Sequence, residues 1–485
     1  MRILFLVIPM FFLGCSVRHH SAPNIILLMA DDLGWGDTGY NGNRVIMTPH
    51  LDRMSEEGIK FNRFYSAAPV CSPTRASCLT GRHPYRTGVF FANTGILRPE
   101  ELTLAEVLKA EGYMTGHFGK WHLGTFSSGE QDANRGGSGH PGLVNPPSGH
   151  GFDTYFSTES KVPTWDPMVR PATFEDPETL RFGWNCLEEG EPAQPYGTAY
   201  WTPGGKAVEN LRGDDSRVIM DRAIPFIEQA VGAETPFFAV IWFHAPHLPV
   251  VAGPEYAAMY EDQDFNMQQF AGSVTAMDAQ VGRLRDRLAA LGIEENTMVW
   301  FCSDNGPEGN DSAPGQTGGF RGRKRSLHEG GVRVPGLLVW PAVVQPAEVN
   351  DPVVTSDYMP TILDAVGAVL PPHSNTLDGV SILPLLKGEA WNRPQPIAFA
   401  SQGQVAYSGV THKLYGSDQL YDIVADPNET TNVAELYPGV VRDYLAAYQS
   451  WYFSCKSSFE GGEYGTASLE RVPQVFPGLK IENIE

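Results

Sequence analysis

Basic residues are scarce in this chain. Its 485 residues include 35 Lys and Arg against 56 Asp and Glu, which gives a formal net charge of −21 at pH 7. A nucleic-acid-binding protein needs a basic surface to neutralise phosphates, so the composition excludes that class. An anionic substrate would therefore require a local cluster of Lys, Arg and His that overrides the acidic surface.

Cysteines and long apolar runs are also sparse. Six cysteines in 485 residues are too few for a disulfide-built scaffold. On the sequence alone, the pairing of four of them stays open, namely Cys78, Cys186, Cys302 and Cys455. The apolar run at residues 3–13 is too short to cross a bilayer, and no later run is apolar enough, so no transmembrane segment is predicted.

The N-terminus is typical of an export signal. Arg2 precedes the apolar run, and we expect residues 1–21 to be a signal peptide. Phe12-Leu13-Gly14-Cys15 resembles a bacterial lipoprotein cleavage box, which would make Cys15 a lipid anchor. Ordinary cleavage between about residues 14 and 22 is the alternative. Both routes predict an exported protein, periplasmic or at the surface of a bacterium.

Three short hydrophobic runs end on polar side chains. They are NIILLMADD (residues 24–32), PFFAVIWFHAPH (236–247) and NTMVWFCSDNG (296–306). Continuous apolar runs of this length are typical of strands buried on both faces of a parallel sheet. Ligands bind at the carboxyl ends of such strands, so we expect these Asp, His and Asn side chains to meet at one sheet edge.

Helices are predicted between these strands. LTLAEVLKAEGY (residues 102–113) carries a capping box, Thr103 followed by Glu106, and has Gly112 at its expected end. SVTAMDAQVGRLRDRLAALG (273–292) has apolar residues at helical spacing and also ends in glycine. The alternation predicts an α/β protein with a large, doubly wound mixed sheet sandwiched by helices.

The C-terminal part of the chain has a different pattern. It carries QLYDIVADPNETTNVAEL (residues 419–436) and a Tyr- and Trp-rich helical run that continues to Phe453. We therefore expect a catalytic domain over residues 22–388 and a smaller α+β subdomain over residues 389–485.

Cys71 lies in a run that has neither a disulfide pattern nor a metal-binding pattern. In PVCSPTRASCLTGRHPYRTG (residues 69–88), no Cys-x-x-Cys spacing occurs and no histidine lies at metal-ligand distance. Cys71-Ser72-Pro73-Thr74-Arg75 instead matches the Cys-x-Pro-x-Arg sequence that formylglycine-generating enzymes modify, and Leu79-Thr80-Gly81 matches the auxiliary part of that signal. A buried, inert cysteine is the competing interpretation, and the five-residue context argues against it.

Five further motifs occur in the order found in one enzyme family. Asp31-Asp32 is followed by GKWHLG (residues 119–124), HAPH (244–247), SDNG (303–306) and FRGRKRSLHEGGVRVP (320–335). Together with the Cys71 run they resemble the type I, formylglycine-dependent sulfatases of the alkaline-phosphatase superfamily, from about residue 24 to 340. The resemblance is to exported bacterial carbohydrate sulfatases and arylsulfatases, and it implies an alkaline-phosphatase-like core.

The resemblance implies a mechanism for sulfate ester hydrolysis. A formylglycine-generating enzyme converts Cys71, and one oxygen of the hydrated aldehyde attacks the sulfur of a sulfate ester. The alcohol leaves, and the second hydroxyl of the diol then collapses to the aldehyde and expels sulfate. This is covalent catalysis, which splits one difficult step into two easier ones.

The other motif residues supply charges that this chemistry requires. An oxygen-rich set suits a hard cation, Ca²⁺ before Mg²⁺, and comprises Asp31, Asp32, Asp304, Asn305 and position 71 itself. Such a cation would bind the diol and a sulfate oxygen and offset negative charge. Arg75, Lys120 and Lys324 would supply positive charge to the nucleophile and the sulfate. Within the basic run at 321–325, only Lys324 matches the family's lysine.

Three histidines complete the predicted site. By the resemblance, His122 is the base for the second proton of the diol, and His244 is the acid at the leaving oxygen. The near-neutral pKa of histidine suits both tasks. The role of His247 stays open between shaping the His-Ala-Pro-His turn and contacting the substrate.

The alcohol part of the substrate is predicted to be a sulfated carbohydrate, bound at a chain end. Export and the segment STESKVPTWDPMVR (residues 157–170) favour this class. Four residues of the segment are candidates for contacts with a sugar, the tryptophan by stacking: Thr164, Trp165, Asp166 and Arg170. A purely structural loop is an equal alternative.

Two other functions stay open on the sequence. A phosphonate or phosphodiester hydrolase of the same superfamily can also carry formylglycine. A two-metal phosphatase would need extra His and Asp ligands, and none cluster after SDNGPEG. An inactive surface glycan-binding homologue would require loss of Cys71 conversion or of a metal ligand, and all of these residues are present.

Overall fold

The structure is a computed structural model that describes residues 22–132, 135–136, 142, 144–174, 182–188, 190–372, 374–464 and 475–478. The predicted signal peptide and Cys15 lie outside the described residues. Within the described ranges, every helix is too short or too polar to span a bilayer. The export signal and the lipid anchor therefore stay predictions.

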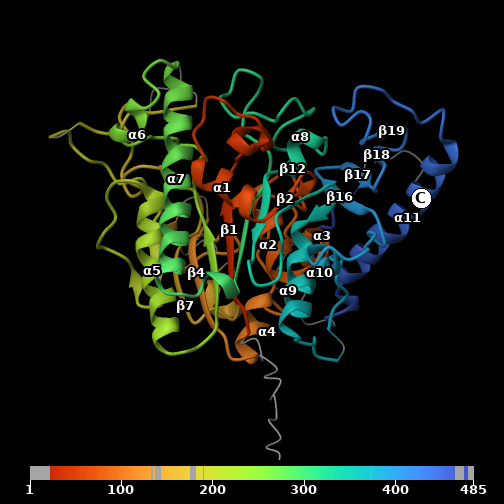
Figure 1. The fold of residues 1–485 in the computed structure, drawn as a ribbon, viewed down its shortest axis with the longest axis horizontal. Coiled ribbons are helices and arrows are strands. Elements are labelled where there is room, and N and C mark those ends of the chain that lie inside the picture. Colours follow the sequence, from red (N-terminus) through yellow and green to blue (C-terminus); the bar gives the residue numbers. More distant parts are fainter. Residues whose placement is uncertain are drawn as a thin grey trace, which may run out of the picture.

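A ten-stranded mixed sheet forms the centre of the molecule (Figure 1). Its five middle strands are parallel, and the strands that flank them, β13 and β8, are antiparallel to their neighbours. Across the sheet the order is β14 (Ala347–Val349), β2 (Ile59–Phe61), β13 (Gly336–Val339), β11 (Thr297–Ser303), β1 (Asn24–Ala30), β10 (Phe237–Trp242), β4 (Met114–Lys120), β7 (Thr154–Thr158), β8 (Tyr200–Thr202) and β9 (Gly205–Lys206). The predicted mixed α/β fold is confirmed.

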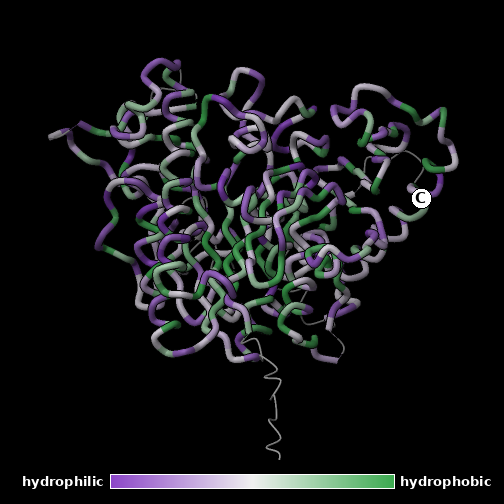
Figure 2. Tube along the Cα trace, viewed as in Figure 1, coloured by the Kyte–Doolittle hydropathy of each residue, from purple (hydrophilic) through white to green (hydrophobic). Residues whose placement is uncertain are grey.

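Helices cover both faces of this sheet. Successive side chains of a strand point to opposite faces, so Ile25, Leu27 and Met29 of β1 join one core cluster and the alternate residues join the other. Each fully buried aliphatic side chain contributes about 2 kcal/mol, and Figure 2 shows the hydrophobic residues gathered at the centre. One face packs on α2 (Cys71–Thr80), α4 (Leu104–Ala110), α9 (Tyr358–Val366) and α10 (Leu383–Leu386), and the other on α1 (Pro49–Glu57), α5 (Asp215–Gly232) and α7 (Phe265–Ala290).

The three strands predicted from hydrophobic runs lie side by side as β11, β1 and β10. All three are parallel, and Met29 of β1 pairs with Cys302 on one side and Trp242 on the other. Their carboxyl ends therefore meet at one edge of the sheet, as expected from the sequence.

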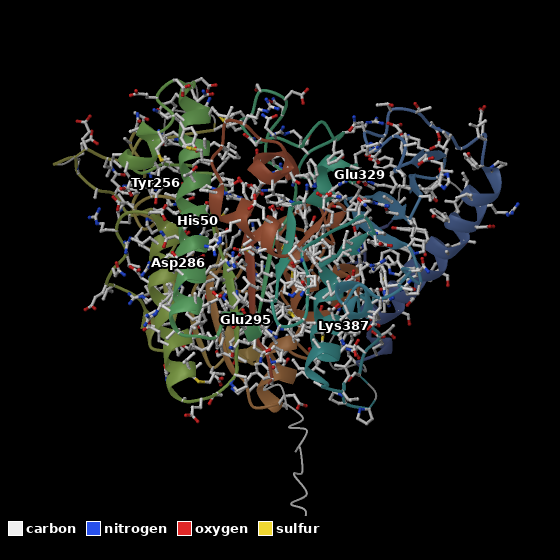
Figure 3. All side chains as sticks on the ribbon, in the orientation of Figure 1. His50, Tyr256, Asp286, Glu295, Glu329 and Lys387 are labelled. Atoms are coloured by element: carbon white, nitrogen blue, oxygen red, sulfur yellow. The ribbon has the colours of Figure 1, made fainter. Side chains whose placement is uncertain are left out.

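The predicted helices occur, with one longer than expected. In α4 the Thr103 hydroxyl accepts a hydrogen bond from the Glu106 amide at 3.2 Å, and Glu106 accepts one from the Thr103 amide at 2.8 Å. The helix predicted from residue 273 begins at Phe265, because the Asp264 side chain caps it by accepting from the Met267 amide. Its first turns pack against α6 (Pro254–Ala258), and His50 of α1 fills the space beside Gly282 further along (Figure 3).

A four-stranded antiparallel sheet and a long helix form the C-terminal part, blue in Figure 1. They are β16 (Ile397–Ser401), β17 (Gln404–Ser408), β18 (His412–Tyr415), β19 (Gln419–Asp422) and α11 (Pro438–Ser457). The predicted boundary after residue 388 falls between α10 and β16 and stays a prediction. Among the described residues the cysteines are unpaired, namely Cys71, Cys78, Cys186, Cys302 and Cys455.

Glu329 joins this C-terminal sheet to the rest of the molecule (Figure 3). It lies in α8 (Glu329–Val332), and its carboxylate accepts hydrogen bonds from Tyr65 Oη and Lys413 Nζ, each at 2.9 Å. Lys413 belongs to β18, and all three side chains are buried. The segment that precedes α8 carries Lys324, so the C-terminal sheet supports one side of the predicted site.

Candidate active site

Cys71 begins helix α2 and lines a cavity of about 450 Å³. It is 2% exposed, and all ten residues of α2 are buried. Burial raises the pKa of the Cys71 thiol, although Lys120 and Lys324 act to lower it. The helix N-terminus also favours negative charge. The thiol sulfur stands where an oxygen of the predicted formylglycine would lie.

Four oxygen-bearing side chains approach Cys71 from the ends of two strands. Asp31 and Asp32 follow β1, Asp304 and Asn305 follow β11, and all four are buried. Ligand atoms of Asp31, Cys71 and Asp304 lie within 4.8 Å of one another. The shared sheet edge thus brings together the residues that the sequence proposed as one metal-binding set.

This set fits a hard divalent cation. Asp31 Oδ1 and Asn305 Oδ1 are buried and accept no hydrogen bond from the described residues, and an unpaired buried acceptor costs about 1–3 kcal/mol. Burial and the nearby Asp31 carboxylate raise the pKa of Asp304 to about 7. Crowded carboxylates with free oxygens are the ligands that Ca²⁺ and Mg²⁺ bind in proteins.

The same carboxylates face three cationic side chains. Each cation forms an ion pair with one of them: Arg75 with Asp304 (2.8 Å), Lys120 with Asp31 (2.6 Å) and Lys324 with Asp32 (2.6 Å). Burial alone would raise the pKa of Asp31, but Lys120, His247 and Arg75 hold it well below its ordinary value. The three predicted cations therefore lie together at this site.

Gly119 allows Lys120 to reach its partner. Gly119 has a φ of +97°, and a Cβ atom there would lie 1.9 Å from the Trp242 carbonyl oxygen of β10. Only glycine fits this close approach of two strands. Lys120, the last residue of β4, therefore extends past β10 to Asp31 at the end of β1.

His122 and His247 line the cavity together with Cys71. His122 Nε2 lies 2.8 Å from Asn93 Oδ1, an acceptor, which leaves Nδ1 free to accept a proton. Burial and the Lys120 charge lower the pKa of His122 well below its ordinary value, so its ring is neutral near pH 7. Burial lowers the pKa of His247 to about 3, and its Nε2 lies 3.5 Å from Asp32.

His244 lies elsewhere. Its side chain is fully buried and is not among the described residues that line the cavity. The ring Nδ1 lies 2.8 Å from Asp215 Oδ2, and Nε2 lies 2.7 Å from Thr158 Oγ1. Both ring nitrogens are thus occupied by side chains, and this placement does not bring His244 to a leaving group in the cavity.

Several residues of the cavity were not among the predicted site residues. They include Asn93, Ser160, Lys161, Phe182, Glu308 and Arg325. A sequence signal for Lys161 was present, because it lies in the segment 157–170 that was proposed to contact a sugar. The structure adds that Lys161 follows β7, which pairs in parallel with β4 and places Thr158 opposite Lys120. Asn93 and Glu308 come from loops, whose positions depend on the packed fold.

The described residues that line the cavity do not include the four proposed to bind sugar, Thr164, Trp165, Asp166 and Arg170. Thr164 Oγ1 donates a hydrogen bond to the Val251 carbonyl and accepts one from the Val251 amide, each at 2.8 Å. Asp166 Oδ1 accepts one from the Gly213 amide at 2.6 Å. These contacts join neighbouring loops, and they favour the interpretation of residues 157–170 as a structural loop over contacts with a sugar.

The fold and the site define a class of protein. The parallel strands β1, β11 and β4 bring the carboxylate set and Lys120 to one edge of the sheet, the usual place of ligand sites in α/β proteins. Helix α2 adds Cys71, and the segment before α8 adds Lys324. Lysines around a crowded carboxylate set favour a substrate that carries negative charge. The chain is thus an α/β protein whose site suits a divalent cation and an anionic substrate.

Comparison with known proteins identifies the family. The family model described as Sulfatase matches residues 23–368. Steryl-sulfatase of Rattus norvegicus is 32% identical over 445 residues, covering 79% of this chain and 74% of that protein. Arylsulfatase A of Homo sapiens is 34% identical over 398 residues, covering 78% and 70%. The chain belongs to the sulfatase family, in the alkaline-phosphatase superfamily, and is a sulfuric ester hydrolase.

Solved structures agree with this assignment. The structure of Ps i-CgsB in complex with k-i-k-neocarrahexaose is similar with a TM-score of 0.75 and 28% identity, covering 89% of this chain and 93% of that chain. A Bacteroides thetaiotaomicron protein labelled BT33336S-sulf has a TM-score of 0.71 and 28% identity, covering 88% and 98%. Family membership implies a formylglycine and a divalent metal, and the acidic groups around Cys71 suit the metal.

Proposed function

We propose that this protein hydrolyses a sulfate monoester at the end of a sulfated saccharide chain, with formylglycine made from Cys71 as the nucleophile. The observation that carries the proposal is the approach of Asp31, Cys71 and Asp304, whose ligand atoms lie within 4.8 Å of one another beside the lysines of the cavity. A saccharide substrate is supported by the similar protein whose structure contains a carrahexaose.

Formylglycine at position 71 would supply, as its hydrated diol, the attacking oxygen. Asp31, Asp32, Asp304 and Asn305 would hold the cation, with Ca²⁺ as first choice and Mg²⁺ as the alternative. The bound cation would offset the negative charge of the sulfate and favour the ionised form of the nucleophile.

Lys120 and Lys324 bind the sulfate oxygens in this scheme. Lys120 is buried, the side chain of Lys324 is 5% exposed, and both line the cavity. A cation held in a dry site stabilises developing negative charge more than one in water. Arg75 acts as a positioning residue, because it pairs with Asp304 at 2.8 Å and donates to the Lys120 carbonyl at 2.9 Å.

The two cavity histidines carry the proton transfers. His122 accepts the second proton of the diol through its free Nδ1. We assign the acid at the leaving oxygen to His247 in place of His244, because His247 lines the cavity. The negative charge of a bound sulfate ester would raise the pKa of His247 and favour its protonated form.

Maturation and location follow from burial and from the N-terminus. Because all of α2 is buried, the formylglycine-generating enzyme must reach Cys71 before folding is complete.

Residues 1–21 would direct export to the periplasm or the cell surface, with Cys15 as a candidate lipid anchor. Residues 22–388 would form the catalytic domain and residues 389–485 the smaller subdomain.

A mass spectrum of the tryptic peptide from Phe64 to Arg75 tests the nucleophile. Conversion of Cys71 appears as loss of one H₂S and gain of one oxygen in protein from a host that matures such sites. The same preparation should hydrolyse an aryl sulfate much faster than an aryl phosphodiester. An unmodified thiol, or faster hydrolysis of the phosphodiester, would overturn the proposal.

A further inference from the structure

The cavity contains a lysine for which the proposed mechanism has no role. Lys161 lies in the loop after β7, on the sheet edge where β4 ends with Lys120. It lines the cavity together with Lys120 and Lys324. Its side chain is neither fully buried nor fully exposed, so it is accessible to a ligand in the cavity.

The cations of the cavity differ in their partners. Lys120 pairs with Asp31 at 2.6 Å, and Lys324 pairs with Asp32 at 2.6 Å. Arg325 is held by two oxygens of Glu308, at 2.6 and 2.9 Å. Lys161, by contrast, has no ion pair and no side-chain hydrogen bond among the described residues.

The surroundings of Lys161 favour an anion. Burial lowers the pKa of Lys161, and so do the nearby Lys120 and Lys324 ammonium groups, whereas the Asp32 and Glu308 carboxylates act more weakly in the opposite direction. Among the described residues that line the cavity, Glu308 is the only carboxylate, and Lys324 and Arg325 already share it. An anionic ligand group beside Lys161 would offset the charge of these ammonium groups.

The loop that carries Lys161 is held in place before any ligand binds. Thr158 Oγ1 lies 2.6 Å from the Ser160 carbonyl oxygen and 2.7 Å from His244 Nε2, and Asp215 holds the other side of that ring. The Trp121 amide donates to the Thr158 carbonyl at 2.9 Å, which ties the loop to the end of β4. A fixed loop loses little entropy when it binds a ligand.

We propose that Lys161 binds a second anionic group of the substrate, so that the enzyme prefers saccharides carrying another sulfate or a carboxylate near the sulfate that is removed. The proposal rests on the proposed function of the site. The cavity of about 450 Å³ has room for a sugar as well as a sulfate group. The shared chemistry is a second negative charge within reach of Lys161.

Three substrates separate the outcomes: 4-nitrophenyl sulfate, which has one anionic group, a monosaccharide disulfate, and a monosulfated hexuronic acid. Lys161→Gln should lower kcat/KM for the disulfate or the uronic acid by about tenfold or more, as expected for loss of a charge-assisted hydrogen bond. For 4-nitrophenyl sulfate the change should stay within about twofold. The substrate with the larger loss identifies the second anion as sulfate or carboxylate.

Two further variants serve as controls. Lys161→Arg keeps the charge and should retain most of the preference for two anions. Lys109→Gln makes the same change in net charge at an exposed ion pair with Asp153, outside the cavity, and should leave kcat/KM unchanged for all three substrates. In the wild-type enzyme, added salt should weaken turnover of the doubly charged substrates more than that of the aryl sulfate.

Equal losses on all three substrates would mean that Lys161 binds the reacting sulfate, and no loss on any of them would mean that it binds nothing. Both results overturn the inference. If the wild type hydrolyses no sulfate ester, the proposed function fails, and calorimetric binding of the disulfate and its monosulfate to a Cys71→Ala variant still tests Lys161. Equal affinity for the two sugars in that variant would overturn the inference separately.

Discussion

The floor and the wall of the cavity hold positive charge in different ways. The floor consists of two lysines of the cavity lining, Lys120 and Lys324, with the buried residues that adjoin them, Arg75, Asp31, Asp32 and Asp304, and each of its cations pairs with a carboxylate. On the wall, Lys161 forms no ion pair and no side-chain hydrogen bond among the described residues, although it lines the cavity together with Glu308. A buried ion needs a partner, because desolvation costs several kcal/mol. The paired floor is therefore a fixed scaffold, whereas the unpaired wall residue is available to a ligand.

Removal of the nucleophile should have the largest effect on catalytic activity. Cys71→Ala should lower turnover of an aryl sulfate by at least about a thousandfold, because the covalent step is lost. Unfolding curves of the variant and the wild type should be close, since only one atom is removed. Cys78→Ala, a buried position outside the cavity lining, is the matched control and should keep its activity. Substantial turnover by a folded Cys71→Ala variant would contradict the mechanism.

The second prediction separates two neighbours in the basic run. Lys324→Ala should lower kcat/KM by about a hundredfold or more, because Lys324 lines the cavity and pairs with Asp32. Arg321→Ala should lower it less than about fivefold, since Arg321 bonds to Tyr421 and to the Glu429 carbonyl, away from the cavity. Steady-state kinetics on both variants test this difference. Equal losses of kcat/KM would contradict the assignment of Lys324 as the sulfate-binding residue.

The third prediction concerns the two histidines of the HAPH turn. His247→Ala should lower kcat by about a hundredfold with little change in the free energy of unfolding, as for a lost general acid. His244→Ala should instead lower the free energy of unfolding by about 2–3 kcal/mol, because it leaves Asp215 and Thr158 without a buried partner. Chemical denaturation and kinetics on both variants test this split. The reverse pattern would restore His244 as the acid.

Removal of the bound cation should disturb the ion pairs of the floor and leave Lys161 on the wall unchanged. EDTA should lower activity by at least about tenfold and reduce the melting temperature, because a site filled at a hundred times its Kd contributes about 2.7 kcal/mol. Added Ca²⁺ should restore both. Full activity in a sample shown by elemental analysis to be metal-free would contradict the cation site.

Asp278 is a buried carboxylate that forms no ion pair with any residue in the described part of the chain. It accepts hydrogen bonds from the His50 and Leu51 amides, and burial raises its pKa to about 7. The folded state then keeps a proton that the unfolded state releases near pH 4. The free energy of unfolding should therefore fall as pH rises from about 4 to 7. Asp278→Asn should flatten that slope in denaturation curves measured across the range.

Much of the fold could be predicted because its signals are local. The runs that became β1, β10 and β11 are continuous and apolar, as strands buried on both faces must be. The Thr103–Glu106 capping box specifies the start of α4 through contacts between residues close in the chain. The start of α7 at Phe265 was not predicted, because polar residues in its first turns interrupt the helical spacing of the apolar residues. The Asp264 cap that begins the helix precedes these turns.

The sequence alone indicates which residues can do the chemistry. Its motifs contain Cys71, the cation-binding carboxylates and the cationic partners, since each residue type is required by the reaction and stands in a contiguous motif. Folding determines which of them face the cavity. It placed His247 there and His244 behind the β7 loop, and it left Lys161 without a partner. The physical reason is that orientation and pairing depend on packing between distant segments, such as β7 against β4, which no local pattern encodes.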